Sequence, residues 1–128
     1  MGDPSELDRT GKLLEAMMGG HADRTESFDA VRAALAAGRA DVVVELSWYP
    51  DGGTHQIVLT QLDGDRIRCF NPAGHKGRSA GEILVDGPFR RRVEEDGSES
   101  FLVAELEARF AAGKAAALLF QGREADPR

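Results

Sequence analysis

The sequence contains very little that could form disulfide bonds or membrane-spanning structure. It has a single cysteine, Cys69, among 128 residues. One cysteine excludes an intramolecular disulfide and fits a reducing compartment, so we expect a cytoplasmic protein. No run of 18 apolar residues occurs, so we expect no membrane insertion. The acidic N-terminus M-G-D-P-S-E-L-D lacks an apolar core, so we do not expect a secretion signal there.

The chain also lacks the charge and the ligand spacing of nucleic-acid-binding and metal-binding proteins. Its net charge is −6, so we expect no nucleic-acid partner. Arg66, Arg68 and residues 90–92 form an arginine cluster, but alternation along a strand divides residues 90–92 between two faces, which favours a solvated sheet surface. The three histidines and the cysteine lack the spacing of zinc sites. We therefore expect no metal and no cofactor.

The pattern of apolar residues predicts one small α+β domain. A chain of this length suits a single core, and 41% hydrophobic with 30% charged residues is ordinary for a globular protein. The expected helices cover residues 3–18, 28–37 and 100–112, and the expected strands cover residues 41–49, 54–61, 65–71, 82–85, 88–93 and 115–120. We predict N-terminal helices packed on a mainly antiparallel sheet. The domain should span residues 1–120, with a frayed tail at 121–128.

The stretch from Thr54 to Gly74 is predicted to be a β-hairpin that carries a histidine and an asparagine. A three-residue loop at Leu62–Gly64 places His55 opposite Asn71, on the face that also carries the apolar residues. A two-residue loop would instead place His55 opposite Pro72, which has no N–H for the strand ladder. The first register fits the apolar pattern better. It predicts that His55 and Asn71 lie side by side on a buried face.

A paired histidine and asparagine has two interpretations. An imidazole that acts as a base needs a hydrogen-bond partner on its other nitrogen, which fixes its tautomer and orientation. In thiol peptidases an asparagine or aspartate has this role. The alternative is that His55 and Asn71 are a structural polar pair at the mouth of a hairpin.

Four segments resemble the papain-like cysteine peptidases. The residues are V-V-V (Val42–Val44), G-T-H-Q-I-V-L (Gly53–Leu59), N-P (Asn71-Pro72) and the predicted helix and strand of Ser100–Phe120. They are most similar to the double-glycine leader peptidase, or bacteriocin-processing, domain of bacterial peptide-exporting ABC transporters. The resemblance covers residues 28–120. It implies a papain-like fold in which His55 and Asn71 occupy the positions of the catalytic histidine and its orienting residue.

The chain departs from this family at the nucleophile. The family has a cysteine at the start of its first long helix and a glutamine upstream that stabilises the oxyanion. Here no cysteine precedes Cys69 and no glutamine occurs in residues 1–55. Aligning the first helix with the family's nucleophile helix places Thr10 in the cysteine position, and a threonine hydroxyl is a poor substitute for a thiol. The resemblance therefore implies a degenerate form.

Three functions remain open at this point. The first is a non-cleaving papain-like domain that binds a peptide or protein in a groove near His55 and Asn71, with Trp48, Tyr49 and Gly53 as contact residues. The second is an active peptidase or acyl transferase that uses Thr10, Cys69 or a cysteine supplied by a partner chain. The third is a structural or regulatory α+β domain unrelated to peptidases. The sequence does not determine an oligomeric state or identify the peptide.

Overall fold

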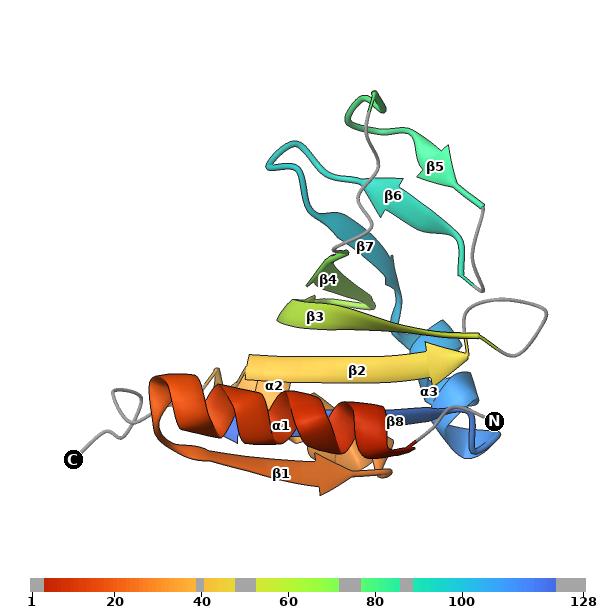
Figure 1. The fold of residues 1–128 in the computed structure, drawn as a ribbon. Coiled ribbons are helices and arrows are strands. Elements are labelled where there is room, and N and C mark those ends of the chain that lie inside the picture. Colours follow the sequence, from red (N-terminus) through yellow and green to blue (C-terminus); the bar gives the residue numbers. More distant parts are fainter. Residues whose placement is uncertain (1–3, 39–40, 48–52, 72–76, 86–88, 122–128) are drawn as a thin grey trace.

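The computed structural model describes residues 4–38, 41–47, 53–71, 77–85 and 89–121 (Figure 1). In these residues the elements are α1 (Pro4–Met18), β1 (His21–Thr25), α2 (Phe28–Ala37), β2 (Asp41–Ser47), β3 (Thr54–Asp63), β4 (Arg66–Phe70), β5 (Ile83–Leu84), β6 (Arg91–Val93), β7 (Glu99–Leu102), α3 (Val103–Ala111) and β8 (Ala115–Gln121). The strands form one sheet in the order β1-β8-β2-β3-β4-β7-β6-β5, with antiparallel pairing throughout. The predicted α+β class is confirmed.

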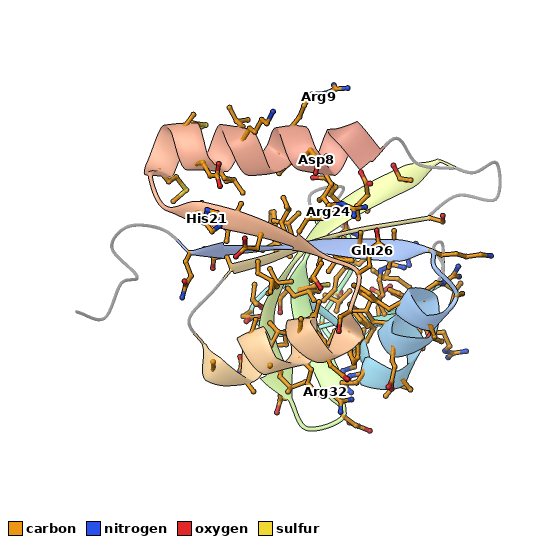
Figure 2. The ribbon with its side chains drawn as sticks, turned by 90° about the horizontal axis from the view of Figure 1, so that it is seen from below. Asp8, Arg9, His21, Arg24, Glu26 and Arg32 are labelled. Atoms are coloured by element: carbon orange, nitrogen blue, oxygen red, sulfur yellow. The ribbon has the colours of Figure 1, made fainter. Side chains whose placement is uncertain are left out.

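Helices cover both faces of the sheet. Helix α1 packs on β1 and β8, whereas α2 and α3 lie on the opposite face, as the edge-on view of the sheet in Figure 2 shows. The α1 side has a small core of Leu7, Val43, Ala116 and Leu118. The α2 and α3 side has the larger core, formed by Phe28, Val31, Val42, Val44, Leu46, Ile57, Leu59, Ile67, Cys69, Phe89, Phe101, Val103, Leu106, Phe110 and Ala117. The two N-terminal helices are therefore separated by the sheet.

The two N-terminal helices form where the apolar spacing predicts them, and α2 is capped at both ends. The Ser27 hydroxyl accepts a hydrogen bond from the Ala30 N–H at 3.4 Å, and Gly38 ends α2 at a φ of 66°. In α1, Leu7 and Gly11 face the sheet, whereas Met17 is exposed. A Cβ at Gly11 would lie 3.4 Å from side-chain atoms of the strands below it. Glycine thus allows α1 to approach the sheet closely.

The hairpin of β3 and β4 forms, but in a different register from the predicted one. The cross-strand partners are Val58 and Phe70, Leu59 and Cys69, Gln61 and Arg68, Leu62 and Ile67, and Asp63 and Arg66. The loop is therefore Gly64-Asp65, with Gly64 at a φ of 64°. A bulge at Thr60 separates the two halves of the pairing. Near Leu59 the predicted register is wrong by two residues, which leaves each side chain on its predicted face.

The segment around Ser100 is strand where we predicted helix. Residues 99–102 form β7, and α3 begins only at Val103, whose N–H donates to the Asp65 carbonyl at 2.8 Å. The pairing of β7 with both β4 and β6 satisfies its backbone on two sides, which outweighs the local helical spacing. Other boundaries also differ: β6 starts at Arg91 rather than at residue 88. The predicted end of β2 at residues 48–49 lies outside the described residues.

Strand β1 forms where we predicted neither a helix nor a strand. Its five residues pair with β8, from His21 opposite Gln121 to Thr25 opposite Ala117. The strand lies at an edge of the sheet, and its charged side chains form ion pairs. The Arg24 guanidinium lies 2.7 Å from the Glu26 carboxylate and 4.0 Å from that of Asp8 on α1 (Figure 2). No helix in the described part of the chain is long and apolar enough to cross a membrane.

Candidate functional site

His55 and Asn71 meet at one end of the sheet. His55 is the second residue of β3, and Asn71 directly follows β4. Continuing the register of Leu59 and Cys69 places Asn71 level with Ile57, so it lies diagonally across from His55. The His55 Nε2 and Asn71 Oδ1 atoms are 2.6 Å apart. The predicted contact is therefore present, although the predicted direct opposition is wrong.

A buried ion pair lies behind Asn71. The Asn71 side-chain NH₂ donates to Glu99 Oε1 at 3.4 Å, and Arg91 Nε donates to the same oxygen at 2.8 Å. The side chains of Arg91 and Glu99 are 2% and 0% exposed. Arg91 also donates to the Phe89 carbonyl at 3.2 Å. Hydrogen bonds thus connect His55, Asn71, Glu99 and Arg91 in a chain that runs from β3 to β6.

Cys69 lies in the core beside this chain and does not have the properties of a nucleophile. It is fully buried and lies opposite Glu99 on the neighbouring strand. Burial, together with the negative charge of Glu99, raises the pKa of the Cys69 thiol to about 12, although the positive charge of Arg91 acts against both. A thiol with this pKa stays protonated near neutral pH, whereas the thiolate is the reactive form.

The structure does not bring Thr10 to the His55 side of the sheet. The Thr10 hydroxyl donates to Gln56 Oε1 at 3.2 Å, and the Gln56 NH₂ donates to the buried Glu45 at 3.4 Å. Successive residues of a strand point to opposite faces, so Gln56 and His55 lie on different sides. Helix α1 packs on the Gln56 side. Aligning α1 with the nucleophile helix of the peptidases is therefore inconsistent with this fold.

A hollow of about 540 Å³ opens at the same end of the sheet as His55. It is lined by Arg24, Glu26, Glu45, Leu46, Ser47, Thr54, Phe110, Gly113, Lys114, Ala115 and Ala116. Leu46 is the cross-strand partner of His55, and Thr54 directly precedes it. Of the predicted contact residues, Gly53 directly precedes β3 and is half-buried, whereas Trp48 and Tyr49 lie outside the described residues.

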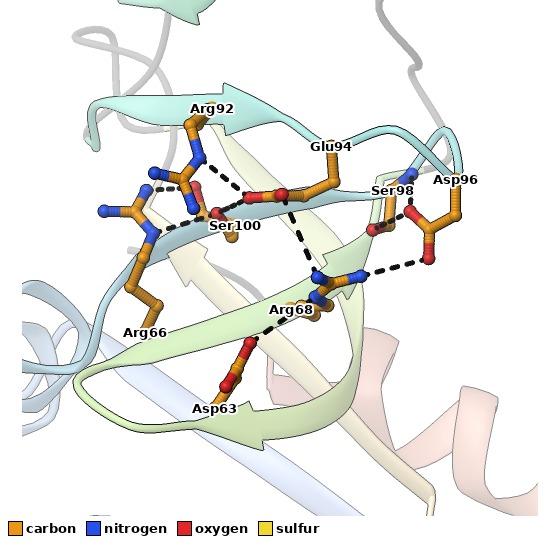
Figure 3. Close-up of polar contacts among 8 residues, drawn as sticks. All are labelled: Asp63, Arg66, Arg68, Arg92, Glu94, Asp96, Ser98 and Ser100. Carbon is orange, nitrogen blue, oxygen red and sulfur yellow. Dashed lines mark hydrogen bonds and ion pairs between the residues drawn. The ribbon is translucent and has the colours of Figure 1, made fainter. Parts of the chain in front are cut away.

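Most of the arginine cluster forms a solvated network on the opposite face of β4, β6 and β7, as predicted. Arg92 pairs with Glu94 at 2.9 Å, and Arg68 pairs with Asp96 at 3.2 Å (Figure 3). Arg66 Nε donates to the Ser100 hydroxyl at 3.0 Å. The exception is Arg91, which points into the core. Acidic partners neutralise this network, so it offers little positive surface.

Sequence reasoning missed Arg91 and Glu99 as members of the site. The arginine cluster that contains Arg91 was predicted to be a solvated surface, and Glu99 lies just before the predicted helix of residues 100–112. One signal was present: Phe89, Arg91 and Val93 alternate along the predicted strand of residues 88–93, and the structure buries all three. An arginine between two inward apolar residues needs a buried anionic partner.

The described residues contain no group of three or more histidine, cysteine or acidic side chains that could hold a metal ion. Comparisons with protein-family models, with curated proteins and with solved structures gave no match. The function of this chain is therefore argued from the geometry of its own residues.

Proposed function

We propose that this chain is a papain-like domain that binds an extended peptide or a partner protein near His55 and Asn71 and does not cleave it. The observation that carries the proposal is the 2.6 Å contact between His55 Nε2 and Asn71 Oδ1. An asparagine that orients a histidine is the arrangement used by thiol peptidases. The strand that carries His55 and the segment that carries Asn71 are the same ones that resemble that family.

A hollow lined by Thr54 and Leu46, the chain neighbour and the cross-strand partner of His55, supports a peptide as the ligand. Its volume of about 540 Å³ is within the range of ordinary ligand sites. Leu46 and Phe110 contribute apolar lining, and the hydroxyl-bearing Ser47 and Thr54 lie where β2 ends and β3 begins. A peptide offers both apolar side chains and backbone hydrogen-bonding groups, so it matches this mixed lining.

The candidate nucleophiles support the non-cleaving part of the proposal. Thr10 is bonded to Gln56 on the other face of the sheet. The pKa of Cys69 is raised to about 12 by its burial. Acyl transfer by this family's chemistry requires a nucleophile within hydrogen-bond reach of the imidazole, and neither residue meets this requirement.

One observation favours a second candidate, a hydrolase or transferase completed by a cysteine from a partner chain. The imidazole of His55 is held by a chain of hydrogen bonds that extends to a buried ion pair. Simple peptide binding does not require so closely held a base. If a partner chain supplied a thiol next to His55, the oriented imidazole could act as its base.

A peptide-binding experiment tests the proposal. The purified chain is titrated with a panel of labelled synthetic peptides, including leader-type peptides that end in Gly-Gly, while backbone amide signals are followed by NMR. We expect saturable binding with the largest shifts at Ser47, Thr54 and His55, and mass spectrometry should recover every peptide intact. Absence of binding across the panel, or shifts confined to another surface, would contradict the proposal. Cleaved peptide would favour the hydrolase.

A pair of matched variants locates the binding site. Thr54→Arg fills the hollow and should weaken peptide binding at least tenfold. Thr60→Arg makes the same substitution on the same strand at an exposed position in the bulge, so it should leave binding unchanged. Equal effects of the two substitutions would show that the hollow is not the binding site.

A further inference from the structure

The chain of hydrogen bonds behind His55 can be followed from its buried end, beginning with Arg91 and Glu99. Their charged groups are 2.8 Å apart, and both side chains are almost fully buried. The surroundings are apolar: the Phe89 and Phe101 rings stack with centroids 4.7 Å apart. A buried ion pair is often no more stabilising than two apolar side chains of the same volume. Its presence in this core therefore calls for a role other than stability.

The ion pair determines which way the Asn71 amide points. An ionised carboxylate can only accept hydrogen bonds, and the Glu99 carboxylate forms an ion pair with the Arg91 guanidinium at 2.8 Å. The group that Asn71 directs toward Glu99 must therefore be its NH₂, as observed at 3.4 Å. The amide oxygen of Asn71 then points toward His55.

The orientation of Asn71 in turn determines the tautomer of His55. An amide oxygen can only accept, so the ring nitrogen 2.6 Å away, Nε2, must carry the proton. In a neutral imidazole the other nitrogen, Nδ1, then carries the lone pair and is the basic atom. The tautomer of the ring thus depends on the charge of Glu99, two residues along the chain of hydrogen bonds.

We infer that Glu99, held in place by Arg91, is a positioning residue that sets the tautomer of His55 through Asn71. The inference deepens the proposed function, and its functional meaning rests on that proposal. The tautomer itself is a property of the protein alone. It can be measured without a peptide, so failure of the inference and failure of peptide binding are distinguishable.

The experiment is long-range ¹H–¹⁵N NMR of the histidine rings in the full chain, at a pH where they are neutral. Only three histidines are present, and His55→Gln identifies the signals of His55. In the wild type we expect a protonated Nε2, a non-protonated Nδ1 and a downfield Nε2–H proton that exchanges slowly. A ring that is protonated at Nδ1 would overturn the inference at once.

The double variant Arg91→Leu/Glu99→Leu removes the ion pair but retains apolar packing, so it should fold. The Asn71 NH₂ then loses the carboxylate that accepts its hydrogen bond and directs the amide oxygen toward His55. We expect the Nε2–H proton to exchange rapidly and be lost, and both ring nitrogens to shift toward values averaged between the tautomers. A folded double variant with unchanged ring signals would overturn the inference.

A rescue and a control separate positioning from general loosening of the core. Adding Asn71→Asp to the double variant supplies a carboxylate that can only accept, so the Nε2–H signal should return without Glu99. Failure of this rescue would show that the effect is not one of amide orientation. The control, Arg92→Gln/Glu94→Gln, breaks an ion pair on the opposite face of the sheet and should leave the His55 ring signals unchanged.

Discussion

The part of the sheet around β6 and β7 carries an ion pair on each of its faces, and the two ion pairs differ in their burial. On one face Arg91 and Glu99 are buried in the core that also contains the stacked rings of Phe89 and Phe101. On the other, Arg92 pairs with Glu94 in a network open to water (Figure 3). Arg91 and Arg92 are adjacent in sequence, so alternation along one strand is enough to assign them to such different surroundings.

The comparison shows that the contribution of an ion pair depends on its surroundings. A solvated pair contributes about 0–1 kcal/mol, because water already stabilises its separated charges. Removing one partner of a buried pair costs about 3–5 kcal/mol, because the other charge stays in a medium that cannot solvate it. The solvated face therefore tolerates substitution, whereas the buried face does not.

The largest expected effect comes from breaking the buried pair on one side only. Glu99→Leu leaves a buried guanidinium without its carboxylate, so the free energy of unfolding should fall by about 3–5 kcal/mol. The double variant Arg91→Leu/Glu99→Leu should recover most of that loss. Urea unfolding followed by circular dichroism measures both changes.

The matched control is Arg92→Leu on the solvated face, where the loss should be at most about 1 kcal/mol. A Glu99→Leu variant as stable as Arg92→Leu would remove the distinction between the faces. A double variant no more stable than Glu99→Leu would show that Arg91 does not cause the loss.

The second prediction concerns the thiol next to Glu99. Because the pKa of Cys69 is about 12 instead of 9.0, the fraction of thiolate at pH 8 should be about a thousandfold lower than in a free cysteine. The native protein should therefore resist a disulfide exchange reagent and react only as fast as it unfolds. Kinetics with and without denaturant measure this. Rapid reaction of the native protein would contradict the assignment of Cys69 to the buried face.

A cysteine on the other side of the sheet sharpens this second prediction. Thr10→Cys in a Cys69→Ala background places a thiol beside Gln56, across the sheet from His55. Its reactivity should therefore be the same with His55 and with His55→Gln. A strong dependence on His55 would restore Thr10 to the nucleophile position and would reopen the peptidase alternative.

The smallest effect is expected from the pH dependence of the solvated face. A hydrogen bond from Ser100, with help from Arg92 and Arg68, lowers the pKa of Glu94 below its ordinary value of 4.5, although desolvation acts against this. A lowered pKa adds stability above pH 4.5, and that stability is lost as the pH falls through the lowered value. Ser100→Ala should therefore cost about 1 kcal/mol at neutral pH and flatten the acid-side loss.

Urea unfolding between pH 7 and pH 3 measures this third effect. Ser98→Ala is the comparison, because Ser98 bonds to the exposed Asp96 and should have a smaller influence. A Ser100→Ala variant with an unchanged pH profile would show that the Ser100 hydroxyl does not stabilise the Glu94 carboxylate.

Local signals in the sequence were enough to predict much of the fold. The caps of α2, the glycine turns and the apolar β2 and β8 each depend on residues close together in the chain. Strand β1 and the segment around Ser100 could not be predicted in this way. Both are strands because distant partners satisfy their backbones, β8 for β1 and β4 with β6 for β7.

The part of the candidate site that depends on residues close together in the chain could also be predicted. His55 and Asn71 belong to one hairpin, and an error of two residues in register keeps both on the same face, so their contact was predicted correctly. Arg91 and Glu99 arrive from strands of a later segment. Their burial depends on the register in which β7 pairs with β4 and β6 pairs with β7, and local periodicity does not determine this register. The predicted position of Thr10 was wrong because the sequence does not determine on which face of the sheet a helix packs.

The bulge at Thr60 has a consequence for how this hairpin can change during evolution. The extra residue reverses the inward and outward alternation between Leu59 and Leu62. The pairing register of the half of the hairpin that carries His55 is therefore independent of the register at the tip. Insertions or deletions at the tip leave the orientation of His55 unaltered as long as the bulge takes up the difference. A change in hairpin length at the tip is thus compatible with an unchanged chain of hydrogen bonds at the other end.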